Sequence, residues 1–206
     1  MTSTQPATPG LAAVEIHGMS RAAFMVRATL AAGSVYGLGA VTPFVGEALA
    51  QSKTGDVDIL NFALMLEYLE TDFYRRASGL SGEAATLART FADEEAAHVG
   101  ALTEAVRGLG GKPVSKPQTS FPRGDQADFL KLAQTLEDVG VSAYNGAAPQ
   151  IQSLQVLAAA GTIVQVEARH AATIRMLNGE EPAPVAFDRI MTQEQVLSAV
   201  QPFVMP

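Results

Sequence analysis

Two short motifs of the form Glu-x-x-His each place a carboxylate and an imidazole on one side of a predicted helix. Glu95 and His98 form the first motif, and Glu167 and His170 form the second. Residues three apart lie on the same face of an α-helix, and in both segments that face is otherwise apolar. Because an unpaired charge in an apolar interior is costly, the fold must bring compensating groups to both motifs. This requirement constrains the fold more than any other feature of the sequence.

The surroundings of the two motifs support this interpretation. The predicted face of the first carries Ala88, Phe91, Leu102, Ala105 and Leu109, and that of the second carries Ala160, Ile163, Ile174 and Leu177. When residues 1–50 are set aside, His98 and His170 are the only histidines in the chain. One Glu-x-x-His motif is weak evidence, but two that use every remaining histidine are much harder to attribute to chance.

The composition excludes several kinds of site. The 206 residues include no cysteine, which excludes disulfides, thiolate metal sites and a cysteine nucleophile. The net charge is −7 and no basic patch occurs, so we expect no nucleic-acid partner. With 48% hydrophobic residues, the chain can build a sizeable core, and its length favours one domain after a leader is removed.

The first 50 residues are interpreted as an export signal. Arg21 and Arg27 precede an apolar run of small residues that ends at Ala48-Leu49-Ala50, an Ala-x-Ala cleavage pattern. Gly and Pro interrupt the run, so a signal peptide is favoured over a stable membrane span. Residues 20–25 resemble the twin-arginine motif with alanine in place of the second arginine, which leaves both Sec and a degenerate twin-arginine route open. We expect the mature chain in the periplasm, in the cell envelope or outside the cell.

Apolar periodicity in the remaining chain predicts four long helices and no strand. Their predicted spans are Asp56 to about Ser78, about Gly82 to Leu109, about Asp125 to Gly146, and Gln150 to about Asn178, with Asp56 as the cap of the first. A loop over residues 180–187 and a short helix over residues 192–200 follow. The predicted domains are a leader over residues 1–50, a bundle over 51–180 and a C-terminal extension over 181–206.

Residues 111–125 form a long loop between the second and third helices, because they contain three prolines and no periodicity. Fifteen extended residues reach roughly 50 Å, whereas a helix of about 25 residues is about 37 Å long. The loop can therefore cross the length of a bundle and start the third helix parallel to the second. This connection predicts an all-α four-helix bundle with a long crossover between helices 2 and 3, plus a short C-terminal helix.

The two halves of the bundle repeat one pattern of polar residues. Glu67 and Tyr74 are seven apart on the first helix, and Glu137 and Tyr144 are seven apart on the third. Seven residues make about two helical turns, so each pair faces the same way. Each half thus reads Glu, then Tyr, then Glu-x-x-His. Folding the halves together brings four carboxylates and two imidazoles to one level of the core, namely Glu67, Glu95, His98, Glu137, Glu167 and His170.

Two divalent cations would neutralise four buried carboxylates, whose pKa values would otherwise rise sharply. Oxygen and imidazole ligands suit iron or manganese, with zinc as an alternative. Each ion would receive one histidine and one terminal glutamate, with two glutamates bridging, and Tyr74 and Tyr144 would orient the glutamates by hydrogen bonds. The alternative is a set of Glu–His ion pairs that fixes the helix register. The neighbouring Glu70, Glu94 and Asp138 are expected on solvated faces.

With these residues in place, the sequence resembles the ferritin-like superfamily. Residues 58–77 are similar to the bacterial branch related to plant desiccation-related proteins, and the resemblance covers about Asp56 to Asn178. It implies a ferritin-like bundle, places the six residues above on the ligand positions, and places Tyr74 on the tyrosine that follows the first ligand. Histidine on both the second and fourth helices is similar to bacterioferritin and rubrerythrin, although the chain lacks the cysteines of the rubrerythrin iron–sulfur domain. The leader is unlike storage ferritins, so a mineral-filled cage is not implied.

These features together predict an exported protein with two divalent metal ions, iron in the first place and manganese as the alternative. The expected reactions are Fe(II) oxidation, peroxide reduction or catalase-like turnover, with O2, peroxide or metal ions as small-molecule partners. One alternative is a non-enzymatic stress or desiccation-related protein with a structural or vestigial metal site. Another is a scaffold that binds a partner through residues 187–206. We expect a homodimer by analogy only and no stable membrane span after cleavage.

Overall fold

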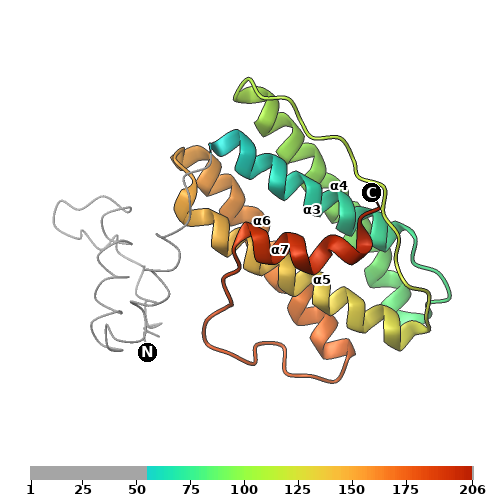
Figure 1. Ribbon diagram of the computed structural model, residues 1–206. Coiled ribbons are helices and arrows are strands. Elements are labelled where there is room, and N and C mark those ends of the chain that lie inside the picture. Colours follow the sequence, from blue (N-terminus) through green and yellow to red (C-terminus); the bar gives the residue numbers. More distant parts are fainter. Residues whose placement is uncertain (1–54, 206) are drawn as a thin grey trace, which may run out of the picture. The chain divides into compact units, whose positions relative to one another are not determined.

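The computed structural model describes residues 55–205, which form an all-α bundle (Figure 1). Its long helices are α3 (Asp56–Arg75), α4 (Gly82–Gly108), α5 (Gln126–Ala147) and α6 (Leu154–Leu177). The short helix α7 (Gln193–Val200) and the 3-10 turns η1 (Ala148–Gln150) and η2 (Gln201–Phe203) complete the described helices. The predicted all-α fold class is confirmed, and the predicted leader lies outside the described residues. None of the helices described over residues 55–205 combines the length with the hydropathy that a membrane span needs.

Two predicted details at the helix ends are wrong. Asp56 does not cap α3, where Gly55 is the N-cap residue. Instead, the two carboxylate oxygens of Asp56 accept hydrogen bonds from the backbone N–H groups of Gln152 and Ser153, each at 2.8 Å. The start of α6 is delayed from Gln150 to Leu154 because η1 intervenes and Ser153 provides the cap. The start of α3 thus holds the start of α6 in place.

The crossover of residues 111–125 follows α3 along the length of the bundle (Figure 1). Near the start of α3, the side chain of Asn61 donates to the Lys112 carbonyl at 3.1 Å and accepts from the Val114 N–H at 2.7 Å. Near its end, the buried Asp72 carboxylate accepts a hydrogen bond from Lys116 Nζ at 2.6 Å. These contacts show that the crossover carries the chain from one end of the bundle to the other.

The consequence is that α4 and α5 run in parallel. Gln126, the first residue of α5, accepts a hydrogen bond through its side chain from the N–H of Ser81, the residue before α4, at 2.9 Å. The two helices therefore begin at the same end of the bundle, as the long crossover predicts. Within each half, α3 pairs with α4 and α5 pairs with α6.

The apolar core consists of two clusters that lie on either side of a polar level. One cluster joins residues from the first half of α3, the end of α4 and the start of α6, including Leu60, Leu64, Leu102, Val106 and Ile163. The other includes Leu69, Phe73, Phe91, Leu136 and Ile174. Leu109, which was predicted to face the core, is instead 45% exposed because it follows the last residue of α4. The polar level between the clusters holds the six residues that the repeat singles out.

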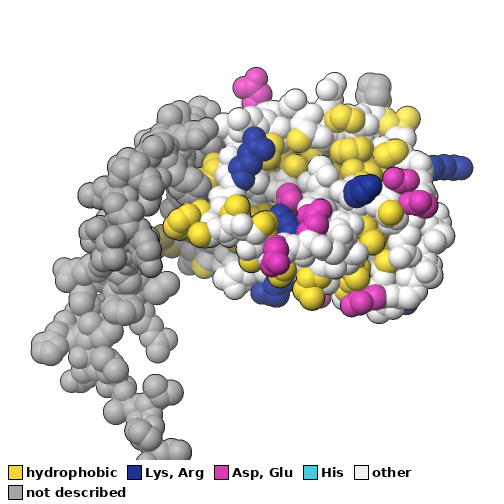
Figure 2. Space-filling view, turned by 90° about the horizontal axis from the view of Figure 1, so that it is seen from below, with side chains coloured by type: hydrophobic (Ala, Val, Ile, Leu, Met, Phe, Trp, Pro, Cys, Tyr) yellow, Lys and Arg dark blue, Asp and Glu magenta, His cyan; other side chains and the backbone are white. Residues whose placement is uncertain are grey.

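The C-terminal extension packs onto the bundle and belongs to its core. Val196 and Val200 of α7 are buried in the second of these clusters, and α7 packs against α5. After η2, the chain pairs with the crossover, since the N–H of Met205 donates to the Gln118 carbonyl at 2.8 Å and the N–H of Ser120 donates to the Phe203 carbonyl at 2.9 Å. On the face shown in Figure 2, acidic, basic and hydrophobic side chains of the described residues are interspersed and no histidine is visible.

A glycine on α5 allows the extension to approach this closely. A Cβ atom on Gly146 would lie 2.0 Å from the carbonyl oxygen of Met191, whose N–H donates to the Ser142 carbonyl at 3.1 Å. We expect Gly146→Ala to push the segment away and to lower the free energy of unfolding by about 1–3 kcal/mol. The matched control is Gly161→Ala on α6, where a Cβ meets no atom within 4 Å and where alanine should raise helix stability by up to about 1 kcal/mol. Urea unfolding of both variants tests this, and equal stabilities would contradict it.

Candidate metal centre

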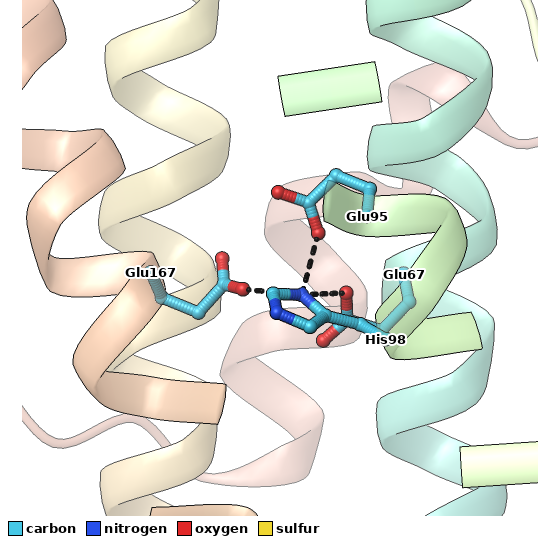
Figure 3. Close-up of side chains that lie close together, drawn as sticks. All are labelled: Glu67, Glu95, His98 and Glu167. Carbon is cyan, nitrogen blue, oxygen red and sulfur yellow. Dashed lines mark hydrogen bonds and ion pairs between the residues drawn. The ribbon is translucent and has the colours of Figure 1, made fainter. Parts of the chain in front are cut away.

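Six buried side chains from α3, α4, α5 and α6 meet at the polar level of the bundle. The carboxylates of Glu67, Glu95, Glu137 and Glu167 belong to residues with 0% exposure, His170 is 2% exposed and His98 is 9% exposed. Each sits on the buried face of its helix, which also carries apolar core residues such as Leu64, Phe91, Ala133 and Ile163. Figure 3 shows Glu67, Glu95 and Glu167 directed toward the His98 ring from three helices.

The six side chains form two overlapping groups of four. Glu67, Glu95, His98 and Glu167 make the first group, and Glu95, Glu137, Glu167 and His170 make the second. Within each group, one potential ligand atom from every residue lies within 4.8 Å of the others. Glu95 and Glu167 belong to both groups, whereas each histidine and each of the other two glutamates belongs to one.

In the first group, one imidazole nitrogen meets three carboxylates. Nδ1 of His98 lies 3.2 Å from Oε2 of Glu67, 3.0 Å from Oε2 of Glu95 and 3.1 Å from Oε1 of Glu167. A single N–H can be directed well at one acceptor, so this arrangement gathers more acceptors than one proton can serve.

In the second group, the two nitrogens of His170 have different surroundings. Nδ1 lies 2.9 Å from Oε1 of Glu95 and 3.5 Å from Oε2 of Glu137. Nε2 points the other way and lies 2.7 Å from Oε2 of Glu94, whose side chain is 46% exposed. A carboxylate on the far nitrogen of a ligating histidine fixes its tautomer and orientation, and Glu94 is placed to do this for His170.

Two tyrosines hold the glutamates that belong to one group only. The hydroxyl of Tyr144 on α5 donates to Oε1 of Glu67 on α3 at 2.5 Å. In the other direction, the hydroxyl of Tyr74 on α3 donates to Oε1 of Glu137 on α5. The two-turn spacing from Glu to Tyr in each half therefore serves the opposite half. Each tyrosine leaves the other oxygen of its glutamate facing the centre.

Several buried atoms of the centre have no hydrogen-bond partner among the described residues. They are one oxygen each of Glu95 and Glu137, both oxygens of Glu167, and Nδ1 of His170. Nδ1 of His170 is close enough to Glu95 for an ion pair but is not in hydrogen-bonding geometry. Buried polar atoms normally have a hydrogen-bond partner, so these five atoms need a partner that the described side chains do not supply. Oxygen and imidazole nitrogen are ligands that iron, manganese and zinc accept, and the residues therefore fit divalent metal ions.

The carboxylates differ in protonation because their surroundings differ. Burial raises the pKa of Glu67 to about 8, although the neighbouring His98 opposes this shift. Burial also disfavours the charge on Glu95, but contacts with His170, His98 and Glu67 outweigh it and lower its pKa to about 2. Burial raises the pKa values of Glu137 and Glu167 as well. Without cations, some of these carboxylates must hold protons in order to stay buried.

Both imidazoles hold their protons strongly in the metal-free protein. Burial disfavours the charged form of His98, but the adjacent carboxylates of Glu167, Glu67 and Glu95 outweigh it and raise its pKa to about 12. The same balance, with Glu137 and Glu95 as the acids, raises the pKa of His170 to about 11. Cations that enter the centre therefore have to displace these protons.

Glu70, Glu94 and Asp138 were expected to lie on solvated faces. This prediction is wrong for Glu70 and incomplete for Glu94 and Asp138. Glu70 is 3% exposed, and burial together with the neighbouring glutamates raises its pKa well above the ordinary value. Glu94 is half-exposed as expected but also binds His170. Asp138 is partly exposed and pairs with Arg175. The sequence did contain a signal for the burial of Glu70. Glu70 follows Glu67 by three residues, as His follows Glu in each Glu-x-x-His motif, so the two glutamates share a helix face.

Comparisons with known proteins agree with this fold. The ferritin-like domain family matches residues 55–180. Protein rds1 of Schizosaccharomyces pombe is 27% identical over 160 residues, which is 72% of this chain and 39% of that protein, so the chain spans well under half of that relative. A conserved hypothetical protein of Mycobacterium tuberculosis, rv2844, has a similar structure with a TM-score of 0.56 and 20% identity over 64% of this chain and 96% of that one. Through residues 55–180, the chain belongs to the ferritin-like domain family.

Proposed function

We propose that the protein binds two divalent metal ions in this centre, with iron or manganese as the metal, and that the pair reacts with O2 or peroxide. The observation that carries the proposal is the membership of Glu95 and Glu167 in both four-residue groups. Two groups that share two carboxylates are what a pair of bridged ions requires. Each ion would then have one histidine, one terminal glutamate and the two shared glutamates as ligands.

The redox chemistry would come from the metal, since a reduced iron or manganese pair can pass electrons to O2 or peroxide. The protein's own residues bind, orient and shield. Tyr74 and Tyr144 hold the terminal glutamates, and Glu94 holds His170. The apolar clusters above and below the centre limit the entry of water. In this proposal, the signal predicted over residues 1–50 directs the reaction to the outside of the cytoplasm.

The test is to purify the mature chain from cells supplied with both iron and manganese and to measure its metal content by mass spectrometry. We expect about two metal ions per chain, Fe(II) oxidation under air, and peroxide consumption by the reduced protein. Glu104→Gln, which alters an exposed acid on the outer side of α4, is the matched control and should behave as the wild type. A metal-loaded protein that turns over neither Fe(II) nor peroxide would reject the redox function while leaving metal binding intact.

The enclosure of the centre favours a second candidate, a structural metal site in a non-enzymatic stress or desiccation-related protein. All four glutamates are 0% exposed, so the described arrangement offers substrates little access. Under this proposal, chelation lowers the melting temperature of the protein while no reaction is lost. The same metal-loaded sample distinguishes the two candidates, because turnover is measured alongside thermal stability.

A further inference from the structure

Glu70 brings a fifth carboxylate to the level of the centre, and no cationic side chain of residues 55–205 forms an ion pair with it. It lies one turn beyond Glu67 on α3 and is 3% exposed. Neither a hydrogen bond nor an ion pair joins its carboxylate to any residue of the described chain. The charged groups that influence it most are Glu167, Glu95, Glu137 and Glu67, all of them acids. Burial without an ion pair disfavours the charged form of this carboxylate, and a cation bound beside it would relieve that cost.

A glycine on α5 makes room for this carboxylate. In the repeat, Gly140 follows Glu137 by three residues, just as Glu70 follows Glu67. A Cβ atom on Gly140 would lie 3.1 Å from Oε1 of Glu70 and 3.4 Å from Oε2 of Glu167. The two oxygens therefore approach the same point on α5, and Oε2 of Glu167 also lacks a hydrogen-bond partner. Glu70 in the first half of the repeat thus supplies a carboxylate, and Gly140 in the second half leaves the space that this carboxylate occupies.

We propose that Glu70 is a seventh protein ligand of the centre, which one of the two metal ions takes up by a shift of the ion or of the carboxylate. The inference rests on the proposed binding of two metal ions. Some shift is needed because Glu70 belongs to neither of the groups whose atoms lie within 4.8 Å of one another. The side chain of glutamate has enough rotatable bonds to make such a shift.

The seventh ligand has a consequence for the symmetry of the centre. Glu70 lies on one side of the repeat only, and Gly140 occupies the equivalent position in the other half. The two metal positions are therefore inequivalent, although the six other ligands are arranged almost symmetrically.

The experiment is a titration of metal-free protein with Co(II), whose visible spectrum reports the number of its ligands. We expect wild-type protein to bind two Co(II) ions, and we expect Glu70→Gln to bind one of them about 10-fold or more weakly, with a changed spectrum. Thermal melting of the metal-free variant should show no loss of stability, because glutamine removes an unpartnered acid. The matched control is Asp72→Asn, a buried acid on the same helix that contacts the crossover, and it should leave both affinities and the spectrum unchanged.

Glu70→Gly should weaken the binding of the same Co(II) ion as Glu70→Gln does, because both substitutions remove the carboxylate. Wild-type affinities and spectrum in Glu70→Gln would overturn the seventh ligand and leave the proposed function standing. Failure of wild-type protein to bind Co(II), iron or manganese would overturn the proposed function itself.

Discussion

Replacing Glu95 with glutamine should empty both metal positions, whereas replacing Glu67 with glutamine should empty only one. Glu95 lies in both groups of candidate ligands and Glu67 lies in one. Loss of a bridging carboxylate would remove a ligand from each ion. It would also leave less negative charge between the two cations, so they would repel each other more strongly. We therefore expect the metal content to fall from about two ions per chain to well below one in Glu95→Gln, and to about one in Glu67→Gln.

Metal analysis by mass spectrometry after loading and desalting measures this difference. Glu167→Gln should match Glu95→Gln, because Glu167 is the other shared residue. Glu137→Gln should match Glu67→Gln, and the exposed acid variant Glu104→Gln should keep both ions. Equal losses in all four glutamate variants of the centre would contradict the division into shared and terminal ligands.

Loading the centre should raise the melting temperature by about 8–16 °C over the metal-free protein. A ligand that binds only the folded state at 1,000 times its dissociation constant stabilises that state by about 4 kcal/mol. In a chain of this size, 1 kcal/mol corresponds to a shift of about 2–4 °C. The physical source is the cation that the unpartnered oxygens of three buried carboxylates gain, namely those of Glu95, Glu137 and Glu167. Calorimetry of chelated and reloaded protein tests this, with Glu95→Gln as a variant that should show little shift.

This gain should grow as the pH rises from about 5 to about 8. In the metal-free protein the pKa of Glu67 is about 8 against an ordinary value of 4.5, and that of His98 is about 12 against 6.5. The folded state therefore binds more protons than the unfolded state in this window, so its stability falls as the pH rises. Glu95, with a pKa of about 2 against 4.5, acts in the opposite sense, but only at lower pH.

Metal ions displace the protons of Glu67 and His98, so the loaded protein avoids the decline and the affinity for metal rises with pH. Melting curves of loaded and chelated protein at three pH values in this range measure the trend. A thermal gain that is constant or shrinks toward pH 8 would show that these protons are not linked to metal binding.

Much of the bundle could be predicted from local pattern alone. The apolar period located the four long helices, and the prolines of residues 111–125 predicted the crossover that makes α4 and α5 parallel. The repeat singled out six polar residues that do lie together in two groups. These predictions were possible because helical periodicity decides which side chains share a face. Four helices that each bury a glutamate of the repeat can be packed in few ways that bring these carboxylates together.

Tertiary structure decided how those faces meet. The burial of Glu70 depends on a glycine seventy positions away on α5, and the contact of Glu94 with His170 joins α4 to α6. Helix packing also decides which glutamates belong to both groups of candidate ligands and which belong to one. It likewise creates the contact between the C-terminal segment and Gly146. A sequence period states the angle of a residue around its own helix axis, whereas the atom opposite it is set by the rotation and height of the neighbouring helix.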